Sequence, residues 1–331
     1  MSYAALRSRA SLAALLAGIG SAALADTPQI VADTSVSHAL TAIVTQGVLE
    51  PTIILDRGAD PHHFAMRPSQ ARAVAQADLA IWMGPEMTPW MGRAVEGLGA
   101  EAQLQLLHVD GLSLQGYLPQ RLTGAAAEAA EEFAHSHDHD HGHSHDHDHG
   151  HDHGHHHGAM DPHAWMRIDN AGIWLDSIAN RLAEMDPANA ETYRANAAAG
   201  RAQLVELRAE IEGILAPVGD AGLVMYHDAY GYLAADFGLN ILGTIALGDA
   251  AAPGAARLSA IRASLEDSGA VCIFPEVNHA DAFVNLVAEG GSLRIGAPLD
   301  PEGVMLEPGP ELYATLMRQM AQTIADCVTE G

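Results

Sequence analysis

Two stretches of the chain alternate short apolar runs with helical patterns, and this alternation restricts the possible folds more than any other feature. Parallel strands need a crossover connection, and a helix is the usual one, so the alternation predicts parallel sheets covered by helices. The first predicted helix spans 37–49, with Ser37 as its cap. The predicted strands are 30–35, 51–55, 79–83 and 103–109 in the first stretch, and 223–226, 240–246, 270–274 and 293–298 in the second.

A long helical segment follows the first stretch. Residues 188–215 contain no proline and are dominated by Ala, Glu, Arg and Leu. Leucine or isoleucine at positions 204, 207, 211 and 215 recurs at the spacing of one helix face. A helix of this length is usually a packing element, and its place between two α/β halves also suits a rigid strut.

A low-complexity tract interrupts the first stretch. Between His135 and His157, histidine alternates with Asp, Ser and Gly. Such polar sequence buries too little apolar area to offset chain entropy, so we predict disorder over about 131–158. Imidazole suits Zn, Cu, Ni and Fe, which makes the tract a candidate for weak accessory metal sites. Its histidines are His135, His137, His139, His141, His143, His145, His147, His149, His151, His153, His155, His156 and His157.

The N-terminus has the pattern of an export signal. Arg7 and Arg9 precede a small-residue apolar run at 11–24, and Ala23-Leu24-Ala25 fits a cleavage site. The run is short for a membrane span, and no cysteine near the cleavage site offers a lipid anchor. We therefore predict a signal peptide at 1–25 and a protein free in the periplasm.

The charge balance excludes one class of partner. The chain has 16 Lys+Arg against 42 Asp+Glu, so it lacks the basic surface that a nucleic-acid partner requires.

Cys272 and Cys327 are the only two cysteines. In an oxidising compartment an even count favours a disulfide, with two buried free thiols as the alternative. Such a bridge contributes up to about 4 kcal/mol in the chain-entropy model.

Three single histidines outside the tract lie where a ligand site is expected. His62 follows the predicted strand 51–55, His227 follows 223–226, and His163 enters a helix behind Pro162. In open α/β sheets, ligands bind beyond the carboxyl ends of the strands. The chain has no H-E-x-x-H or C-x-x-C motif, so the fold itself has to assemble any such site.

Three other histidines are not predicted to bind the metal. His38 lies inside a predicted helix and His108 inside a predicted strand, and we expect both to be structural. His279 is predicted to begin a helix at the surface.

Four motifs in the sequence resemble those of a known protein family. The chain resembles the zinc-binding ZnuA type of periplasmic solute-binding proteins, in cluster A-I (TroA-like) of the ABC importers. The motifs occur in the family's order over the whole mature chain. They are Gly58-Ala59-Asp60-Pro61-His62-His63-Phe64-Ala65-Met66-Arg67-Pro68-Ser69, Gly84-Pro85-Glu86-Met87, Asp161-Pro162-His163-Ala164-Trp165 and Tyr226-His227-Asp228-Ala229-Tyr230-Gly231-Tyr232.

The resemblance implies an α/β fold of two similar lobes, each with a mostly parallel sheet flanked by helices. One long rigid helix joins the lobes, and the metal site lies in the cleft between them. The expected division is 26–185 for the N-terminal lobe, 186–217 for the linking helix and 218–331 for the C-terminal lobe. The resemblance also implies that the disulfide lies in the C-terminal lobe.

By resemblance, the metal ligands are His62 (not the neighbouring His63), His163 and His227. Asp300 or water is expected at the fourth position. Manganese-type relatives have a carboxylate in the place of His227, and a third imidazole favours Zn²⁺ over Mn²⁺. Tyr226, Asp228 and Trp165 are expected to surround the ligands rather than to bind the ion.

The function implied is the capture of Zn²⁺ and its delivery to a membrane-embedded ABC permease by a monomer that is not an enzyme. Two alternatives remain open. One is a manganese or iron binder of the same fold. The other is a zinc hydrolase, because three histidines with an open fourth position also describe a catalytic site. Against the hydrolase, no glutamate accompanies the three histidines at short spacing. The tract is interpreted as a weak zinc scavenger, a sensor of zinc load or a solvated insertion.

Overall fold

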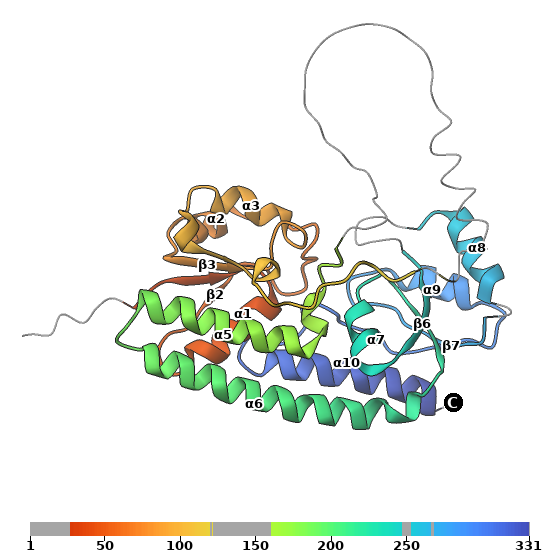
Figure 1. Ribbon diagram of the computed structural model, residues 1–331. Helices are drawn as coiled ribbons and strands as arrows, with labels where there is room; N and C mark the ends of the chain where they lie inside the picture. Colours follow the sequence, from red (N-terminus) through yellow and green to blue (C-terminus); the bar gives the residue numbers. More distant parts are fainter. Residues whose placement is uncertain (1–26, 120, 122–159, 247–252, 266–267, 331) are drawn as a thin grey trace, which may run out of the picture.

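The first sheet lies in the N-terminal half of the chain. In the computed structural model, the described residues are 27–119, 121, 160–246, 253–265 and 268–330 (Figure 1). The predicted signal peptide and histidine tract lie outside them. The sheet is all parallel, with the order β2-β1-β3-β4. Its strands are β1 (Ile30–Ala32), β2 (Thr52–Ile53), β3 (Leu79–Trp82) and β4 (Gln103–Gln105).

Helices cover both faces of this sheet, which explains why β1 and β3 are continuous apolar runs that are buried throughout. Figure 1 shows α2 and α3 on one side of the strands and α1 and α5 on the other. The four strands are shorter than predicted, and 106–108 form a 3-10 turn, not the end of β4. The helices are α1 (Ser35–Thr45), α2 (Pro68–Ala75), α3 (Pro89–Val95) and α5 (Ile168–Met185).

The start of α1 differs from the prediction. The helix begins at Ser35, and its cap is Thr34 rather than Ser37. The backbone N–H of Ser37 donates to Thr34 Oγ1 at 3.3 Å, and the N–H of Thr34 donates to Ser37 Oγ at 3.0 Å. The contact with Thr34 Oγ1 supplies an acceptor for the Ser37 N–H in the first turn, and the Thr34 N–H also donates to Asp33 Oδ1 at 2.8 Å. Both residues are good caps, and the reciprocal geometry decides between them.

The second sheet repeats the strand order of the first. It is all parallel, with the order β6-β5-β7-β8. The two-sheet parallel α/β fold predicted from the sequence is therefore confirmed. The strands are β5 (Gly222–Met225), β6 (Asn240–Thr244), β7 (Ala270–Ile273) and β8 (Arg294–Ile295), and the helices are α7 (Gly231–Phe237), α8 (Ala255–Leu265), α9 (Asp281–Ala288) and α10 (Leu312–Thr329).

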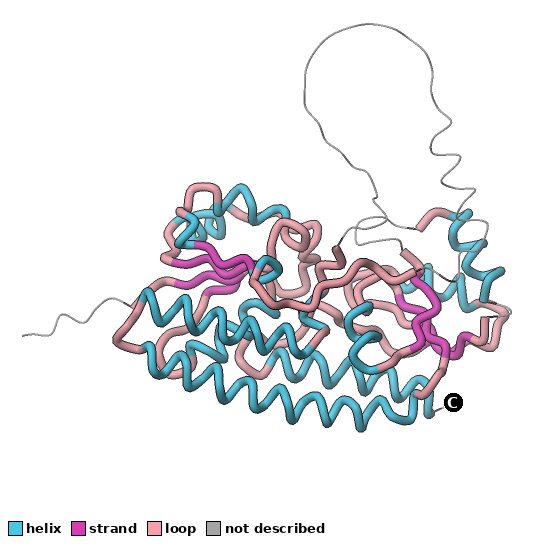
Figure 2. Tube along the Cα trace, in the orientation of Figure 1, coloured by secondary structure: helices cyan, strands magenta, loops and turns pink. Residues whose placement is uncertain are grey.

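The long helix α6 (Ala190–Leu215) runs along one side of the molecule past both sheets, beside α10 (Figures 1 and 2). Its 26 residues span about 39 Å at the standard rise. The helix packs closely on α5 and α1 at Gly200, where a Cβ would lie 2.9 Å from side-chain atoms of both Ile43 and Leu175. Helix α6 is thus a packing element, with buried residues from Tyr193 to Leu215. The residue boundaries of the two lobes remain a prediction.

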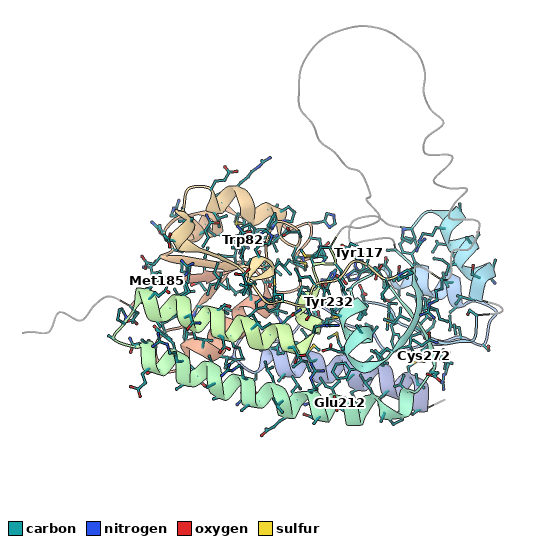
Figure 3. The ribbon with its side chains drawn as sticks, viewed as in Figure 1. Trp82, Tyr117, Met185, Glu212, Tyr232 and Cys272 are labelled. Atoms are coloured by element: carbon teal, nitrogen blue, oxygen red, sulfur yellow. A yellow bond between two sulfur atoms is a disulfide. The ribbon has the colours of Figure 1, made fainter. Side chains whose placement is uncertain are left out.

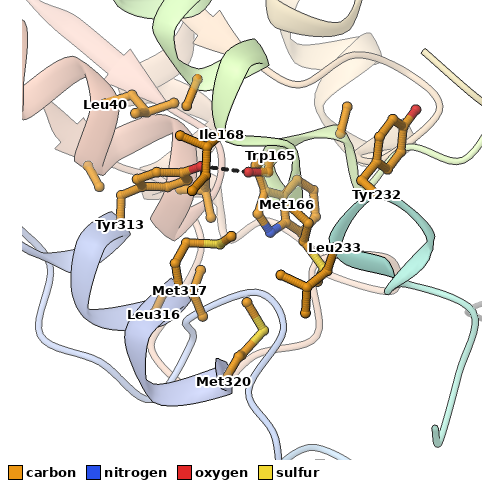
Figure 4. Close-up of a cluster of buried hydrophobic side chains, with 14 of the residues drawn as sticks. Leu40, Trp165, Met166, Ile168, Tyr232, Leu233, Tyr313, Leu316, Met317 and Met320 are labelled. Atoms are coloured by element: carbon orange, nitrogen blue, oxygen red, sulfur yellow. Dashed lines mark hydrogen bonds between the residues drawn. The ribbon is translucent and has the colours of Figure 1, made fainter. Parts of the chain in front are cut away.

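One apolar core connects the two halves of the molecule. Trp165, Tyr313 and Leu233 come from segments far apart in the sequence and belong to the same buried cluster (Figure 4). The Tyr313 hydroxyl donates to the carbonyl of Trp165 at 2.7 Å, and Trp165 Nε1 donates to the carbonyl of Pro301 at 3.0 Å. Trp165 therefore links α10 and the loop before it to the segment that carries His163.

The disulfide is present as predicted. Cys272 in β7 and Cys327 in α10 form a bond of 2.04 Å (Figure 3). It ties the closing helix to a central strand of the second sheet. Within the described part of the chain, no helix has both the length and the apolar character required to span a bilayer.

Candidate metal centre

The three histidines predicted as ligands lie together, and one glutamate joins them. One potential ligand atom each from His62, His163, His227 and Glu302 all lie within 4.8 Å of one another. His62 follows β2, His227 follows β5, and His163 directly precedes the short helix η3 (Ala164–Met166). The four side chains come from both halves of the chain and converge on a single point.

A buried carboxylate sets the orientation of His163. Its Nδ1 lies 2.7 Å from Asp161 Oδ1, and both side chains are completely buried. Because the ionised carboxylate can only accept, Nδ1 carries the proton and Nε2 presents its lone pair. That Nε2 lies 3.4 Å from Nε2 of His227.

His227 has the same arrangement with another carboxylate. Its Nδ1 lies 2.6 Å from Glu276 Oε2, and Tyr230 donates its hydroxyl to Glu276 Oε1 at 2.8 Å. Burial raises the pKa of Glu276, but the attraction of His227 and these hydrogen bonds outweigh burial and lower that pKa overall. Glu276 is therefore ionised and holds the Nε2 of His227 toward the site.

The loop at 60–63 separates His62 from its neighbour. The backbone N–H of His62 donates to Asp60 Oδ1 at 2.8 Å, while Asp60 Oδ2 lies 2.9 Å from Nδ1 of His63. This turn directs the two rings apart, and His63 remains half exposed.

His62 is held in the form that binds metal. Burial, together with repulsion from His163 and His227, lowers the pKa of His62 well below its ordinary value. The ring is therefore neutral at pH 7, and metal binding there displaces no proton from it.

Asp300, one of the two expectations for the fourth position, is held by hydrogen bonds within its own turn. The carboxylate of Asp300 accepts the backbone N–H groups of Val304 and Met305 at 3.0 and 2.9 Å, so it closes a turn. Asp300 is absent from the group of converging ligand atoms. Glu302, inside that turn, is buried, and its Oε1 lies 3.6 Å from Nε2 of His227. Glu302 was missed because it lies in an irregular turn with Asp300, where only the tertiary fold determines which carboxylate reaches the histidines.

The turn that carries Glu302 is attached to the loop that carries His62. The N–H of Gly58 donates to the carbonyl of Val304 at 3.0 Å. The guanidinium of Arg57 donates to the carbonyl of Met305 through Nε and Nη2 at 3.2 and 2.7 Å, and it also pairs with Glu307. These contacts join residues about 250 positions apart in the chain and position two of the candidate ligands together.

The other histidines divide into different environments. His38 is buried, and its Nε2 lies 3.1 Å from the carbonyl of Pro51, as expected for a structural residue. His108 was predicted to lie in a strand but lies in the 3-10 turn, half exposed, with Nε2 at 2.9 Å from Glu86. His279 does not cap α9, because the capping residue is Ala280, and its ring stacks on Tyr226.

A small pocket opens onto the site. His62, His227 and Glu302 line it together with Glu276 and His279. The side chain of His163 is 0% exposed, and its Nε2 lies 3.4 Å from that of the lining residue His227. Three imidazoles and one carboxylate at this spacing form a donor set of the kind that binds Zn²⁺ tetrahedrally. The three predicted histidines and Glu302 therefore form one candidate metal centre.

The fold has solved relatives that share this architecture. The periplasmic zinc-binding protein TroA from Treponema pallidum superimposes with a TM-score of 0.70 at 19% identity, covering 91% of this chain and 99% of that chain. The solute-binding protein FpvC from Pseudomonas aeruginosa, in complex with Mn²⁺, gives a TM-score of 0.71 at 18% identity, covering 92% and 99%. The chain therefore shares the fold of these two binding proteins.

Sequence comparison identifies the family within this class. The family model described as "ZnuA: Zinc-uptake complex component A periplasmic" matches residues 30–327. The high-affinity zinc uptake system protein ZnuA of Paracoccus denitrificans (strain Pd 1222) is 45% identical over 328 residues, covering 97% of this chain and 98% of that protein. The chain belongs to the ZnuA family, whose members are transport components and not enzymes. The resemblance drawn from the four motifs is confirmed.

Replacement of Glu276 by Gln should weaken metal binding without unfolding the protein. The amide keeps the size of the side chain but loses the charge that fixes the His227 ring. Loss of a hydrogen-bonded partner of this kind typically lowers affinity by roughly 10–100-fold. Chelator competition with Zn²⁺ measures the change. Asp281→Asn, at an exposed position on nearby α9, is the control. An affinity equal to wild type in Glu276→Gln would contradict the role of Glu276.

Proposed function

We propose that this protein captures Zn²⁺ in the periplasm with high affinity and delivers it to a membrane-embedded ABC permease. The observation that carries the proposal is the convergence of His62, His163, His227 and Glu302 on one point. The relatives in Paracoccus denitrificans and Brucella suis, 45% and 35% identical, are both named high-affinity zinc uptake system proteins. The likeness extends over nearly the full length of both.

The chemistry of the donors supports zinc as the cargo. Three imidazole nitrogens form a softer set than the oxygen-rich sites that suit Mn²⁺. Asp161 and Glu276 raise the basicity of two of the rings, which strengthens their bonds to the ion. One structural neighbour binds Mn²⁺, so competition between Zn²⁺ and Mn²⁺ for the metal-free protein is the direct test of this choice.

The sequence supplies the remaining parts of the proposal. Export would follow cleavage after Ala25, which yields a mature chain beginning at Asp26. The protein would act as a monomer that docks on its permease. The thirteen histidines of the tract would bind additional Zn²⁺ weakly and raise its concentration near the main site.

His163→Ala should abolish tight zinc binding. His163 is completely buried and lies close to both other histidines, with ring centroids 5.4 Å from His62 and 5.2 Å from His227. Removal of a ligand should cost more than the roughly 10–100-fold that loss of an outer partner costs. Titration of the metal-free protein with Zn²⁺ against a competing chelator measures it. His108→Ala removes an exposed histidine outside the pocket and should bind as wild type does. Retention of tight binding by His163→Ala would overturn the proposal.

Glu302→Gln and Asp300→Asn identify the fourth ligand. If Glu302 binds the ion, its amide variant should lose much more affinity than Asp300→Asn. The asparagine retains one oxygen that can accept a hydrogen bond from the turn. Zinc affinity and the visible spectrum of the Co²⁺-substituted protein, which reports on the donor set, should change together in Glu302→Gln. The opposite order of effects would restore Asp300 as the ligand.

Deletion of residues 135–157 should remove the weak zinc equivalents and preserve the tight one. All four proposed ligands of the tight site lie outside the deleted segment. Calorimetric titration of the intact and deleted chains counts both classes of site. Replacement of the thirteen histidines by asparagine is the matched control, because it keeps the length of the tract. Loss of the tight equivalent on deletion would show that the tract belongs to the main site.

A further inference from the structure

His279 has no part in the site described above, although it lines the same pocket. Its ring stacks on Tyr226 with centroids 4.2 Å apart and an angle of 14° between the planes. Its Nε2 lies 3.6 Å from Glu276 Oε2. The stacking fixes the ring of His279 so that one nitrogen stays close to the Glu276 carboxylate.

A second group of metal-binding atoms is formed here. One potential ligand atom each from His227, Glu276 and His279 lie within 4.8 Å of one another. This group shares His227 with the inner group, because the Nε2 of His227 faces His163 and its Nδ1 faces Glu276. The two groups therefore lie on opposite sides of a single imidazole ring.

The exposed fraction of the side chain differs between the buried His163 of the inner group and the partly exposed His279 of the second group. The side chain of His163 is 0% exposed, those of His227 and Glu276 are 3% and 2% exposed, and that of His279 is 28% exposed. His279 is therefore the solvent-exposed end of the second group, and an ion arriving in the pocket can reach its ring nitrogen without passing His163. The second group thus extends from the pocket to the buried ring of His227.

We propose that His279 and Glu276 form an outer Zn²⁺ position through which the ion enters and leaves the inner site. This inference rests on the proposed function. Water would complete the coordination of the ion at the outer position, since only part of the donor set is protein.

The outer position is suited to brief occupancy. Glu276 Oε2 accepts from His227 Nδ1 at 2.6 Å, and the same oxygen faces His279. An outer ion would take this oxygen from His227 and so weaken the hydrogen bond that orients His227 for the inner site. Each position is therefore strongest when the other is empty, and the ion should pass between them instead of filling both.

The rates of zinc exchange test this proposal. Association is followed after mixing metal-free protein with Zn²⁺, and dissociation by chasing the complex of one equivalent with excess chelator. His279→Phe keeps a ring to stack on Tyr226 but has no donor atom, and His279→Gln loses the ring. Both should slow association and release by a similar factor, roughly tenfold, which is about 1.4 kcal/mol on the barrier. The equilibrium affinity should stay within about twofold of wild type, because an intermediate position alters both rates equally.

The possible results separate the explanations. Wild-type rates in both variants would show that no ion passes through His279. Wild-type rates in His279→Phe alone would mean that stacking on Tyr226 is its only role, and a rise in release with weaker affinity would mean that it acts by positioning Glu276. Each of these three results overturns the proposal. His108→Gln is the control for loss of an exposed histidine. Absence of tight binding in the wild-type protein would overturn the proposed function itself.

Discussion

The site depends on two buried hydrogen bonds between a carboxylate and an imidazole. Asp161 and Glu276 each accept from the Nδ1 of a histidine, at 2.7 and 2.6 Å, and so select which nitrogen faces inward. A neutral imidazole without such a partner has two tautomers of similar energy, and only one of them presents a lone pair to the ion. With both rings fixed, the Nε2 atoms of His163 and His227 lie 3.4 Å apart, close enough to bind one ion together. The rest of the structure serves to bring these pairs to the same place.

The fold achieves this because parallel strands end at the same edge of a sheet. His62 follows β2 in the first sheet, while His227 and Glu276 follow the neighbouring strands β5 and β7 in the second. Each sheet therefore contributes ligands from its carboxyl edge, in agreement with the rule for open α/β sheets. The two edges are held near each other because helix α6 runs past both sheets with α10 beside it (Figure 1), and because the core around Trp165 is shared (Figure 4). The attachment of Val304 and Met305 to the loop at 57–58 then places Glu302 opposite the histidines.

The sequence was sufficient for the features that have a periodic or compositional signal. Alternating strands and helices predicted the two parallel sheets, and the cysteine count with the export signal favoured the disulfide between Cys272 and Cys327. The strand positions also indicated His62 and His227 as candidates, and His163 was a candidate because it enters a helix behind Pro162. The features that were missed depend on which way a side chain points in an irregular loop. Asp300 and Glu302 are both acidic and only two residues apart, and hydrogen bonds to Val304 and Met305 distinguish them. The stacking of His279 on Tyr226 joins segments more than fifty residues apart and leaves no local pattern.

A carrier differs from a storage protein because it must release what it binds. The complete burial of His163 shields this donor from water, but a chelating group that removes the ion has to reach it from the pocket. A partly exposed histidine next to Glu276 offers a way around this conflict, because the ion can exchange ligands one at a time as it moves outward. Glu276 would then have two functions in one carboxylate, since it orients His227 while the ion is inside and receives the ion as it leaves. The short distance between Glu276 and His227 stabilises the inner site. Because the same carboxylate oxygen also faces His279, the outer position next to it is suited to release the ion.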